Sequence, residues 1–296
     1  MKRRFEQVAV LMGGVSSERE VSLRSGAAAA RGLRESGYRV EEVDVTERAV
    51  ELPPETEAVF IALHGVFGED GEVQRLLEEL GVPYTGSRPA ACRLAFDKIL
   101  TRGRLEASGI PVAPGEVLRE GGKRTLPLPV VVKPPREGSS VGCHIVFDEA
   151  EWEPAFRDVL RYGEEALVER YIPGRELTVG ILDGEPLPVV EIRAARRWYD
   201  FEAKYLSGDT RYIVPAELDE ATARRVQEIA RETFRVLDAE GFGRVDLRLS
   251  PEGEPFVLEL NTIPGLTASS LLPKAAAAAG IAFPELCSRI MESARL

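Results

Sequence analysis

The chain has 296 residues, which is enough for two or three compact domains. Its 44% hydrophobic and 29% charged residues are ordinary for a soluble globular protein, and its formal net charge of −11 argues against a broad surface for nucleic acid or membrane. No apolar run approaches the roughly 20 residues that span a bilayer. The first residues also lack the long apolar stretch of a signal peptide, so we predict a cytoplasmic protein without nucleic-acid or membrane partners.

Three cysteines, Cys92, Cys143 and Cys287, are far apart and form no CxxC pair. This spacing predicts neither a disulfide framework nor a zinc site. We expect each cysteine to be a small, buried, apolar side chain.

Residues 1–87 are predicted to form an α/β unit. Ser17, followed by Glu20, has the pattern of a helix capping box, and the helix continues to about Gly37, where glycine can end it. The other predicted elements are strands at 8–12, 38–45 and 58–63 and a helix at 72–80. Alternating strands and helices favour a parallel sheet with helices on its faces.

Two further units are predicted at 88–172 and 173–296. The elements of the first are helices at 89–93, 97–107 and 151–160 and strands at 130–133, near 145 and at 166–171. The elements of the second are strands at 176–182 and 187–192, a helix at 219–237, a β-hairpin and two C-terminal helices.

The hairpin is predicted at 243–261, where polar and apolar residues alternate on both sides of a turn-forming segment. If the hairpin is symmetric, Asp246 lies opposite Glu259 and Arg244 lies opposite Asn261. All four side chains then share one face, because strand side chains alternate. The apolar side chains of the other face are predicted to be core: Val245, Leu247, Leu249, Phe256, Leu258 and Leu260.

Two carboxylates opposite each other on paired strands lie about 5 Å apart and repel. A bound Mg²⁺ would offset the repulsion between Asp246 and Glu259, because it prefers oxygen ligands and often combines carboxylates with substrate phosphates. Asn261 adds a neutral oxygen. The alternative is a solvated polar face on which Arg244 neutralises an acid, and a register shift of one residue would remove the metal site.

A glycine- and serine-rich segment at 136–142, REGSSVG, follows Lys133 at the end of an apolar strand. Glycines let backbone N–H groups approach phosphate closely, and serine hydroxyls add donors. The segment lacks the GxxxxGK[ST] pattern, and an ordinary turn is the alternative. The lysine that leads directly into it favours a phosphate site.

Eight segments together carry a family resemblance: LMGGVSSEREVSLRSG, ALHGVFGEDG, PYTGS, FDK, VVKPPREGSSVG, EAKYLSGDT, GRVDL and LELNTIPGLTASSL. In this order, from residue 10 to about residue 272, the sequence resembles the D-alanine–D-alanine ligases of the ATP-grasp superfamily. The resemblance implies a fold that combines α/β and α+β parts. An N-terminal βαβ, Rossmann-like domain precedes two ATP-grasp subdomains that hold the nucleotide between them.

The resemblance also implies the reaction ATP + 2 D-alanine → D-alanyl-D-alanine + ADP + phosphate, which serves peptidoglycan synthesis, cell wall biogenesis and cell shape. The carboxylate of the first D-alanine attacks the γ-phosphate to give D-alanyl phosphate, and the amine of the second attacks its carbonyl. Charge neutralisation and positioning are the main tasks in such phosphoryl transfer. Two Mg²⁺ or Mn²⁺ ions per site and a homodimer are typical of the family.

Residues that match the family's ATP site come from several segments. Lys98 and Lys133 match phosphate-binding lysines, and Glu169 and Glu176 match residues that hold the adenosine. Ile172 is either part of the adenine pocket or strand core. The full ATP-binding set that the resemblance implies is Lys98, Lys133, Ser139, Ser140, Glu169, Arg170, Ile172, Glu176 and Lys204, with Arg170 standing where many members carry lysine.

Four residues match the metal ligands and the arginine that stabilises the oxyanion. Asp246, Glu259 and Asn261 match the metal ligands, in agreement with the hairpin geometry. Arg244 matches the arginine that stabilises the tetrahedral oxyanion, a role for which a permanent guanidinium charge is suited.

The substrate site is expected around Glu18, which matches the glutamate that binds the ammonium of the first D-alanine; its alternative role is a favourable acid in the first turn of a helix. Ser139 and Tyr205 match its hydrogen-bond partners, and a loop at 198–210 would close over the site. Exclusion of water by this loop would protect the acyl phosphate, whereas an exposed β-ribbon is the alternative.

Three further residues match the two amino-acid subsites. His64 matches a histidine near the first substrate, although a structural hydrogen-bonding role remains equally open. Ser270 and Leu271 match the region of the second substrate, near a helix start whose N–H groups can hold a carboxylate. The catalytic set implied by the resemblance is Glu18, Ser139, Tyr205 and Arg244.

The sequence has features in common with three other classes of protein. A D-alanine–D-lactate ligase would share most of these motifs, although Tyr205 in the loop motif favours an amine as second substrate. A nucleotide-binding module without catalysis should have lost the metal ligands or the oxyanion arginine. A dinucleotide-dependent oxidoreductase is suggested by Gly13-Gly14 after the first strand, but the GxGxxG pattern is missing there.

Overall fold

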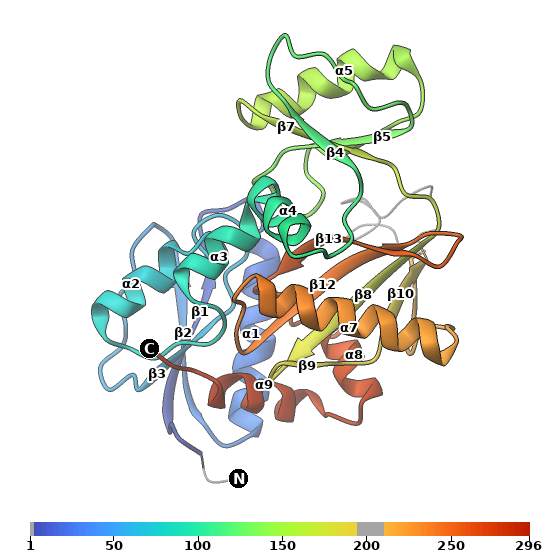
Figure 1. Ribbon diagram of the computed structural model, residues 1–296. Coiled ribbons are helices and arrows are strands. Elements are labelled where there is room, and N and C mark those ends of the chain that lie inside the picture. The colour runs from blue at the N-terminus through green and yellow to red at the C-terminus, as the bar shows by residue number, and fades with distance from the viewer. Residues whose placement is uncertain (1–2, 194–209) are drawn as a thin grey trace.

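The computed structural model describes residues 3–193 and 210–296, which three β-sheets organise (Figure 1). The N-terminal sheet has the order β2-β1-β3, the central sheet β4-β7-β5-β6, and the C-terminal sheet β11-β10-β8-β12-β13 with β9 beside β8. The strands are β1 (Gln7–Gly13), β2 (Arg39–Val45), β3 (Ala58–Ile61), β4 (Gly115–Leu118), β5 (Val130–Lys133), β6 (His144–Val146), β7 (Ala166–Arg170), β8 (Arg175–Leu182), β9 (Glu185–Pro186), β10 (Val190–Arg193), β11 (Arg211–Ile213), β12 (Phe242–Leu249) and β13 (Pro255–Asn261). The α-helices are α1 (Arg19–Glu35), α2 (Glu72–Leu80), α3 (Pro89–Phe96), α4 (Lys98–Ala107), α5 (Glu149–Val159), α7 (Glu220–Val236), α8 (Leu271–Ala278) and α9 (Phe283–Glu292).

The N-terminal sheet is parallel, as the sequence predicted. β1 pairs in parallel with both β2 and β3. Its residues from Val8 to Leu11 are fully buried, because this central strand is covered on both sides. The helix α1 packs on β1 and brings its N-terminus to the end of the strand.

The predicted capping box at Ser17 was wrong. Helix α1 begins at Arg19 with Glu18 at the N-cap position, and no side chain accepts a capping hydrogen bond there. Ser16 explains the later start, because its hydroxyl donates to the carbonyl of His64 at 2.6 Å and accepts from the N–H of Glu18 at 3.2 Å. The chain therefore crosses toward His64 before it turns into the helix.

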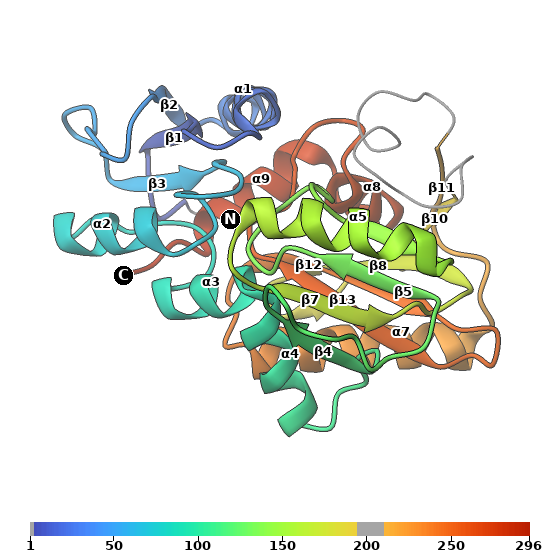
Figure 2. The same cartoon turned by 90° about the horizontal axis from the view of Figure 1, so that it is seen from above.

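The C-terminal sheet has one face for packing and one face for the cleft. Val245 and Leu247 of β12 are fully buried and belong to the same core cluster as Val226 and Phe234 of α7. The alternate side chains of β12 point to the other face. In both views the central sheet and α5 lie over this second face (Figures 1 and 2).

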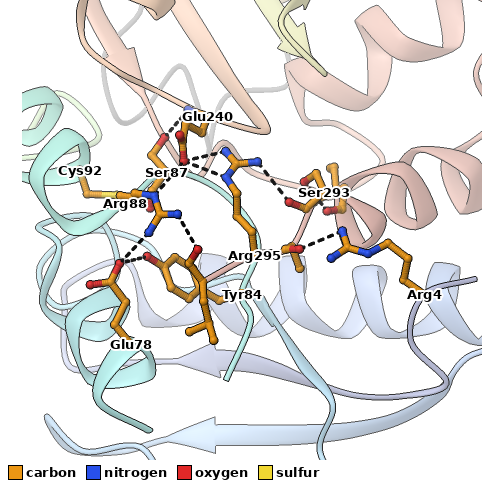
Figure 3. A network of polar contacts seen from close by, with 12 residues as sticks. Arg4, Glu78, Tyr84, Ser87, Arg88, Cys92, Glu240, Ser293 and Arg295 are labelled. Atoms are coloured by element: carbon orange, nitrogen blue, oxygen red, sulfur yellow. Dashed lines mark hydrogen bonds and ion pairs between the residues drawn. The ribbon is translucent and has the colours of Figure 1, made fainter. Parts of the chain in front are cut away.

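An apolar contact and the chain end hold the N-terminal and C-terminal sheets together. Phe60 of β3 and Phe242 of β12 are both fully buried, with ring centroids 6.4 Å apart. Arg295 exchanges two backbone hydrogen bonds with Tyr84, of 3.1 and 3.2 Å, and its guanidinium donates to Glu240 at 2.9 Å (Figure 3). Because Tyr84 follows α2 and Glu240 precedes β12, the chain end connects two distant parts of the sequence.

Helices of the described segments, 3–193 and 210–296, include none that is both long and apolar enough to cross a membrane.

Candidate functional site

The predicted register of the β12–β13 hairpin is confirmed. Asp246 pairs with Glu259, and Arg244 pairs with Asn261. Arg244 Nε and Nη2 donate to the two carboxylate oxygens of Asp246 at 2.8 and 2.7 Å, and Asn261 Nδ2 donates to Asp246 at 3.0 Å. Thr178 of β8 adds a hydroxyl donor at 2.5 Å. Asp246 is therefore held by a cation, an amide and a hydroxyl on one face of the sheet.

The core face predicted for β13 was partly wrong, because this strand contains a β-bulge. The register shifts between Asp246 and Leu247, so that Leu247 pairs with Val257 and Leu258 becomes the extra residue. Val257 takes the buried position, at 2% exposure. Phe256 and Leu258 are only half-buried, and Leu258 lines the cavity instead of the core.

Glu259 faces a lysine from another element. Lys98, the first residue of α4, lies with its Nζ 3.3 Å from Glu259 Oε2 and donates to the carbonyl of Glu137 at 2.8 Å. Asp97 fixes the start of α4, because its carboxylate accepts from the N–H groups of Ile99 and Leu100. A helix cap therefore sets the position of Lys98 between the hairpin and the glycine- and serine-rich segment.

A buried trio joins the central sheet to α4. Lys133 Nζ lies 2.6 Å from Glu169 Oε2, and Arg102 Nη1 donates to Glu169 Oε1 at 3.1 Å. Burial alone lowers the pKa of Lys133, but the Glu169 carboxylate outweighs this effect and raises the pKa above its usual value. Lys133 is therefore a fully protonated cation, and Glu169 is shared between two cations.

The glycine- and serine-rich segment runs close to Glu18. The hydroxyl of Ser139 donates to Glu18 Oε1, and a Cβ at Gly138 would lie 2.6 Å from Glu18 Oε2. Ser139 and Ser140 have φ angles of 50° and 60°, a left-handed conformation that is uncommon for residues other than glycine. Ser139 lines one cavity and Ser140 lines another, so this turn divides the site.

The two cavities meet at the hairpin. The first, between the central and C-terminal sheets, is lined by residues that include Lys98, Lys133, Ser140, Glu169, Arg170, Ile172, Glu176 and Asp246. The second, toward the N-terminal sheet, is lined by residues that include Glu18, His64, Ser139, Asn261 and Ser270. Arg244, Glu259 and Leu271 line both. A ligand in the first cavity can therefore reach a ligand in the second next to Arg244.

His64 is buried in a hydrogen-bond network and also lines the second cavity. Its ring nitrogens lie 3.0 Å from the carbonyl of Ile263 and 3.1 Å from the hydroxyl of Ser25, and Nδ1 is 3.5 Å from Glu69 Oε1. Burial raises the pKa of Glu69, and its interaction with His64 opposes the increase. These contacts hold the His64 ring in place beside the second cavity.

Ser270 and Leu271 lie at the start of α8. Ser270 is the N-cap residue, and its hydroxyl accepts from the N–H of Thr267 at 3.0 Å. Because Ser270 uses its side chain on Thr267, it does not cap the helix with its side chain. The first N–H groups of α8 therefore lack a side-chain cap from Ser270, and both residues line the second cavity.

Two predicted site residues lie outside the described part of the chain, and the three cysteines differ in burial. Lys204 and Tyr205 lie outside the described residues, as does almost all of the predicted loop at 198–210. Cys92 and Cys287 are buried as expected, and burial raises the pKa of each thiol to about 12. The expectation for Cys143 was wrong, because it is only half-buried and lines the first cavity beside Lys133.

Two family models match the chain. The model for the D-ala D-ala ligase N-terminus matches residues 41–87, and the model for the D-ala D-ala ligase C-terminus matches residues 105–292. The chain belongs to the D-alanine–D-alanine ligase family. A protein of this name from Anaeromyxobacter sp. (strain K) is 47% identical over 300 residues, which cover 98% of this chain and 97% of the relative. One from Methylacidiphilum infernorum (isolate V4) is 45% identical over 285 residues, or 96% and 94% of the two chains.

Solved structures of the D-alanine–D-alanine ligase family have the same fold. The ligase from Bacillus anthracis superposes with a TM-score of 0.88 at 36% identity, and a second structure of it, complexed with ATP, gives 0.86 at 33% identity. Each comparison covers 97% of both chains. The predicted family and its ATP-grasp fold are confirmed.

Sequence reasoning missed three side chains that shape the site of this ligase family member. Arg102 follows Lys98 by four residues, so helical periodicity would have placed both on one face of α4. Arg248 follows Asp246 by two residues, so strand alternation would have placed it on the cleft face. Thr178 lies on β8, and no local pattern connects it with Asp246.

We predict that Arg102→Met lowers the free energy of unfolding by about 3 kcal/mol, because removing one partner of a buried ion pair leaves the other charge poorly compensated. The side chains of Arg102 and Glu169 are 10% and 8% exposed. Urea-induced unfolding followed by circular dichroism measures the change. The control is Arg104→Met on the same helix, where the side chain is 52% exposed and the cost should stay below about 1 kcal/mol. Equal losses in the two variants would contradict a special contribution from the trio.

Proposed function

We propose that the protein joins two D-alanine molecules with ATP, giving D-alanyl-D-alanine, ADP and phosphate. The observation that carries the proposal is the meeting of two cavities at Arg244 and Glu259, one with Lys98 and Lys133 and the other with Glu18. Family membership over almost the whole chain supports the same reaction. ATP fits the first cavity, because lysines neutralise phosphates and the apolar residues beside Glu169 suit a base.

The second cavity suits the amino-acid substrates. An amino acid carries an ammonium group and a carboxylate, and the Glu18 carboxylate offers an anionic partner for the ammonium. Ser139 fixes the orientation of Glu18 through its hydroxyl. The N–H groups at the start of α8, beside Ser270 and Leu271, suit the carboxylate of the second D-alanine.

Arg244 suits the centre of the reaction. The first D-alanine's carboxylate would attack the γ-phosphate to give D-alanyl phosphate, and the second D-alanine's amine would then attack that carbonyl. The carbonyl oxygen gains negative charge during the attack, and a fixed guanidinium at the junction of the cavities can stabilise it. Arg244 keeps its orientation because Asp246 binds it through two parallel hydrogen bonds.

The donor set of the hairpin fits a divalent metal ion. Asp246 and Glu259 are paired across the strands and Asn261 is adjacent, and such oxygen donors suit Mg²⁺ or Mn²⁺. Among the residues described, no group of three His, Cys, Asp or Glu side chains is placed to hold a metal, so the proposal depends on two carboxylates and an amide. Bound ions, two per site by family resemblance, would neutralise the carboxylates and the phosphates.

The remaining parts of the proposal come from the resemblance. We propose that units 1–87, 88–172 and 173–296 act as the substrate-binding domain and the two ATP-grasp subdomains. Lys204 and Tyr205 keep their proposed roles toward phosphate and Glu18. A homodimer that works in the cytoplasm, in peptidoglycan synthesis and cell wall biogenesis, agrees with the family resemblance.

A phosphate-release assay tests the reaction. We expect stoichiometric ADP and phosphate only when ATP, Mg²⁺ and D-alanine are all present, because the acceptor carboxylate must be bound before transfer. Mass spectrometry of the product should show D-alanyl-D-alanine, also when D-lactate is added as a competing second substrate. Turnover with L-alanine in place of D-alanine would overturn the substrate assignment, and a D-alanyl-D-lactate product would favour the ester-forming alternative.

Asp246→Asn tests the metal site. The amide keeps the shape of the side chain but removes the charge, so we expect kcat to fall about a hundredfold or more, as for other losses of fixed transition-state electrostatics. Binding of Mn²⁺ in the presence of ADP, followed by electron paramagnetic resonance, should weaken in parallel. Asp238→Asn is the control, because that side chain is 75% exposed and lies outside both cavities. Unchanged Mn²⁺ binding by a folded Asp246→Asn protein would reject the ligand role.

Gly138→Ala tests the position of Glu18. The added Cβ would lie 2.6 Å from Glu18 Oε2 and push the carboxylate away, so we expect the Michaelis constant for D-alanine to rise about tenfold. Gly103→Ala on α4 is the matched control, because nothing lies within 4 Å of its Cβ. It should leave the Michaelis constant unchanged and stabilise the helix by about 1 kcal/mol. A Gly138→Ala protein with an unchanged Michaelis constant would show that Glu18 does not hold this substrate.

A further inference from the structure

Arg248 is a cavity-lining arginine that the proposed reaction does not use. It lies on β12 two residues after Asp246, on the cleft face, and its side chain is only 14% exposed. It lines the first cavity together with Ile172 and Glu176, whereas the described lining of the second cavity does not include it. Arg248 therefore lies at the proposed nucleotide site and not at the proposed amino-acid site.

The guanidinium of Arg248 binds the segment that crosses from the central sheet to the C-terminal sheet. Nε donates to the carbonyl of Ile172 at 3.1 Å, and Nη2 donates to the carbonyl of Gly174 at 3.0 Å. Nη1 lies 3.4 Å from Glu176 Oε2. The guanidinium carbon is also 5.7 Å from the centroid of the Tyr171 ring. The Arg248 side chain therefore contacts four residues: Tyr171, Ile172 and Gly174 of the crossing segment, and Glu176 at the start of β8.

The crossing segment also approaches β12 through its backbone. Gly174 has a φ of 117°, and a Cβ there would lie 2.1 Å from the carbonyl oxygen of Leu249. Only glycine allows this approach, because any side chain would collide with the backbone. Arg248 and the Gly174 contact are adjacent on β12, so together they fix the distance between the crossing segment and the strand.

We propose that Arg248 is a positioning residue for the nucleotide: it holds residues 171–176 so that Ile172 and Glu176 face the adenosine end of ATP. The proposal rests on the proposed ATP-dependent function and deepens it. Arginine suits the task because its planar fork donates to two carbonyls and a carboxylate at once, whereas a lysine ammonium cannot span the same partners.

The consequence is a selective effect on nucleotide binding. Without the guanidinium, the carbonyls of Ile172 and Gly174 lose this donor, and Glu176 loses its contact with Arg248. The crossing segment would then sample positions in which the adenosine end of the cavity is not formed, and part of the binding free energy would go into ordering it. Lys98, Lys133 and Arg244 keep their own partners, so the phosphates and the amino acids would bind as before.

The test compares Arg248→Met and Arg248→Lys with wild type. Isothermal titration calorimetry with ADP and Mg²⁺ measures the dissociation constant, and phosphate release gives kcat and both Michaelis constants. We expect Arg248→Met to raise the ADP dissociation constant and the Michaelis constant for ATP about tenfold or more. Arg248→Lys should raise them about threefold or more, because the charge beside Glu176 remains. The Michaelis constant for D-alanine, and kcat at saturating ATP, should stay within about twofold.

Arg225→Met is the matched control, because Arg225 pairs with Glu254 through two hydrogen bonds outside both cavities. It should leave all constants unchanged. Unchanged ADP binding in Arg248→Lys overturns the proposal, and this variant decides alone if Arg248→Met does not fold. Equal increases in the Michaelis constants for ATP and D-alanine also overturn it. Wild type that binds ADP but releases no phosphate with D-alanine refutes the proposed function, while calorimetry still decides the role of Arg248.

Discussion

The cleft depends on the neutralisation of carboxylates by cations, because unpaired carboxylates in a partly buried site would repel one another. The acid–base pairs that line it are Glu169–Lys133, Glu176–Arg248, Asp246–Arg244 and Glu259–Lys98. Three of these pairs join different elements, and the Glu259–Lys98 pair connects the C-terminal sheet to helix α4. An anionic ligand must compete with the carboxylates for the same cations. A divalent ion held by Asp246 and Glu259 would remove that competition at Arg244 and Lys98, which is a physical reason for nucleotide and metal to bind together.

The turn at Ser139 and Ser140 lies between the two cavities. Successive left-handed residues cost free energy when they are not glycine, and such strain is retained where the surrounding contacts determine the conformation. Here the contact between Ser139 and Glu18 holds one side of the turn, while Ser140 lines the other cavity. One short turn thus lines both the proposed substrate cavity and the proposed nucleotide cavity.

The sequence pattern predicted those features that depend on neighbouring residues along the chain. The parallel N-terminal sheet and the pairing of Asp246 with Glu259 followed from alternation and spacing. The bulge at Leu258 did not, because a single extra residue is invisible to a period-two pattern until the neighbouring strand is known. The cap at Ser17 failed for a related reason: Ser16 is bound by His64, 48 residues away. Arg102 and Arg248 lie on the faces that helical and strand periodicity give them, but their partners belong to distant segments, so their roles required the tertiary structure.

The second cavity, the proposed substrate site, is built from three separate parts of the chain, so its shape depends on contacts outside the cavity. Glu18 lies at the start of α1, Ser139 lies between β5 and β6, and Ser270 lies at the start of α8. The position of Glu18 relative to Arg244 therefore depends on how the N-terminal and C-terminal sheets meet. Phe60, Phe242 and Arg295 contribute to that junction, together with a core cluster that spans both sheets. Because a displacement of about 1 Å can reduce a rate a hundredfold, the packing of this junction is part of the catalytic geometry.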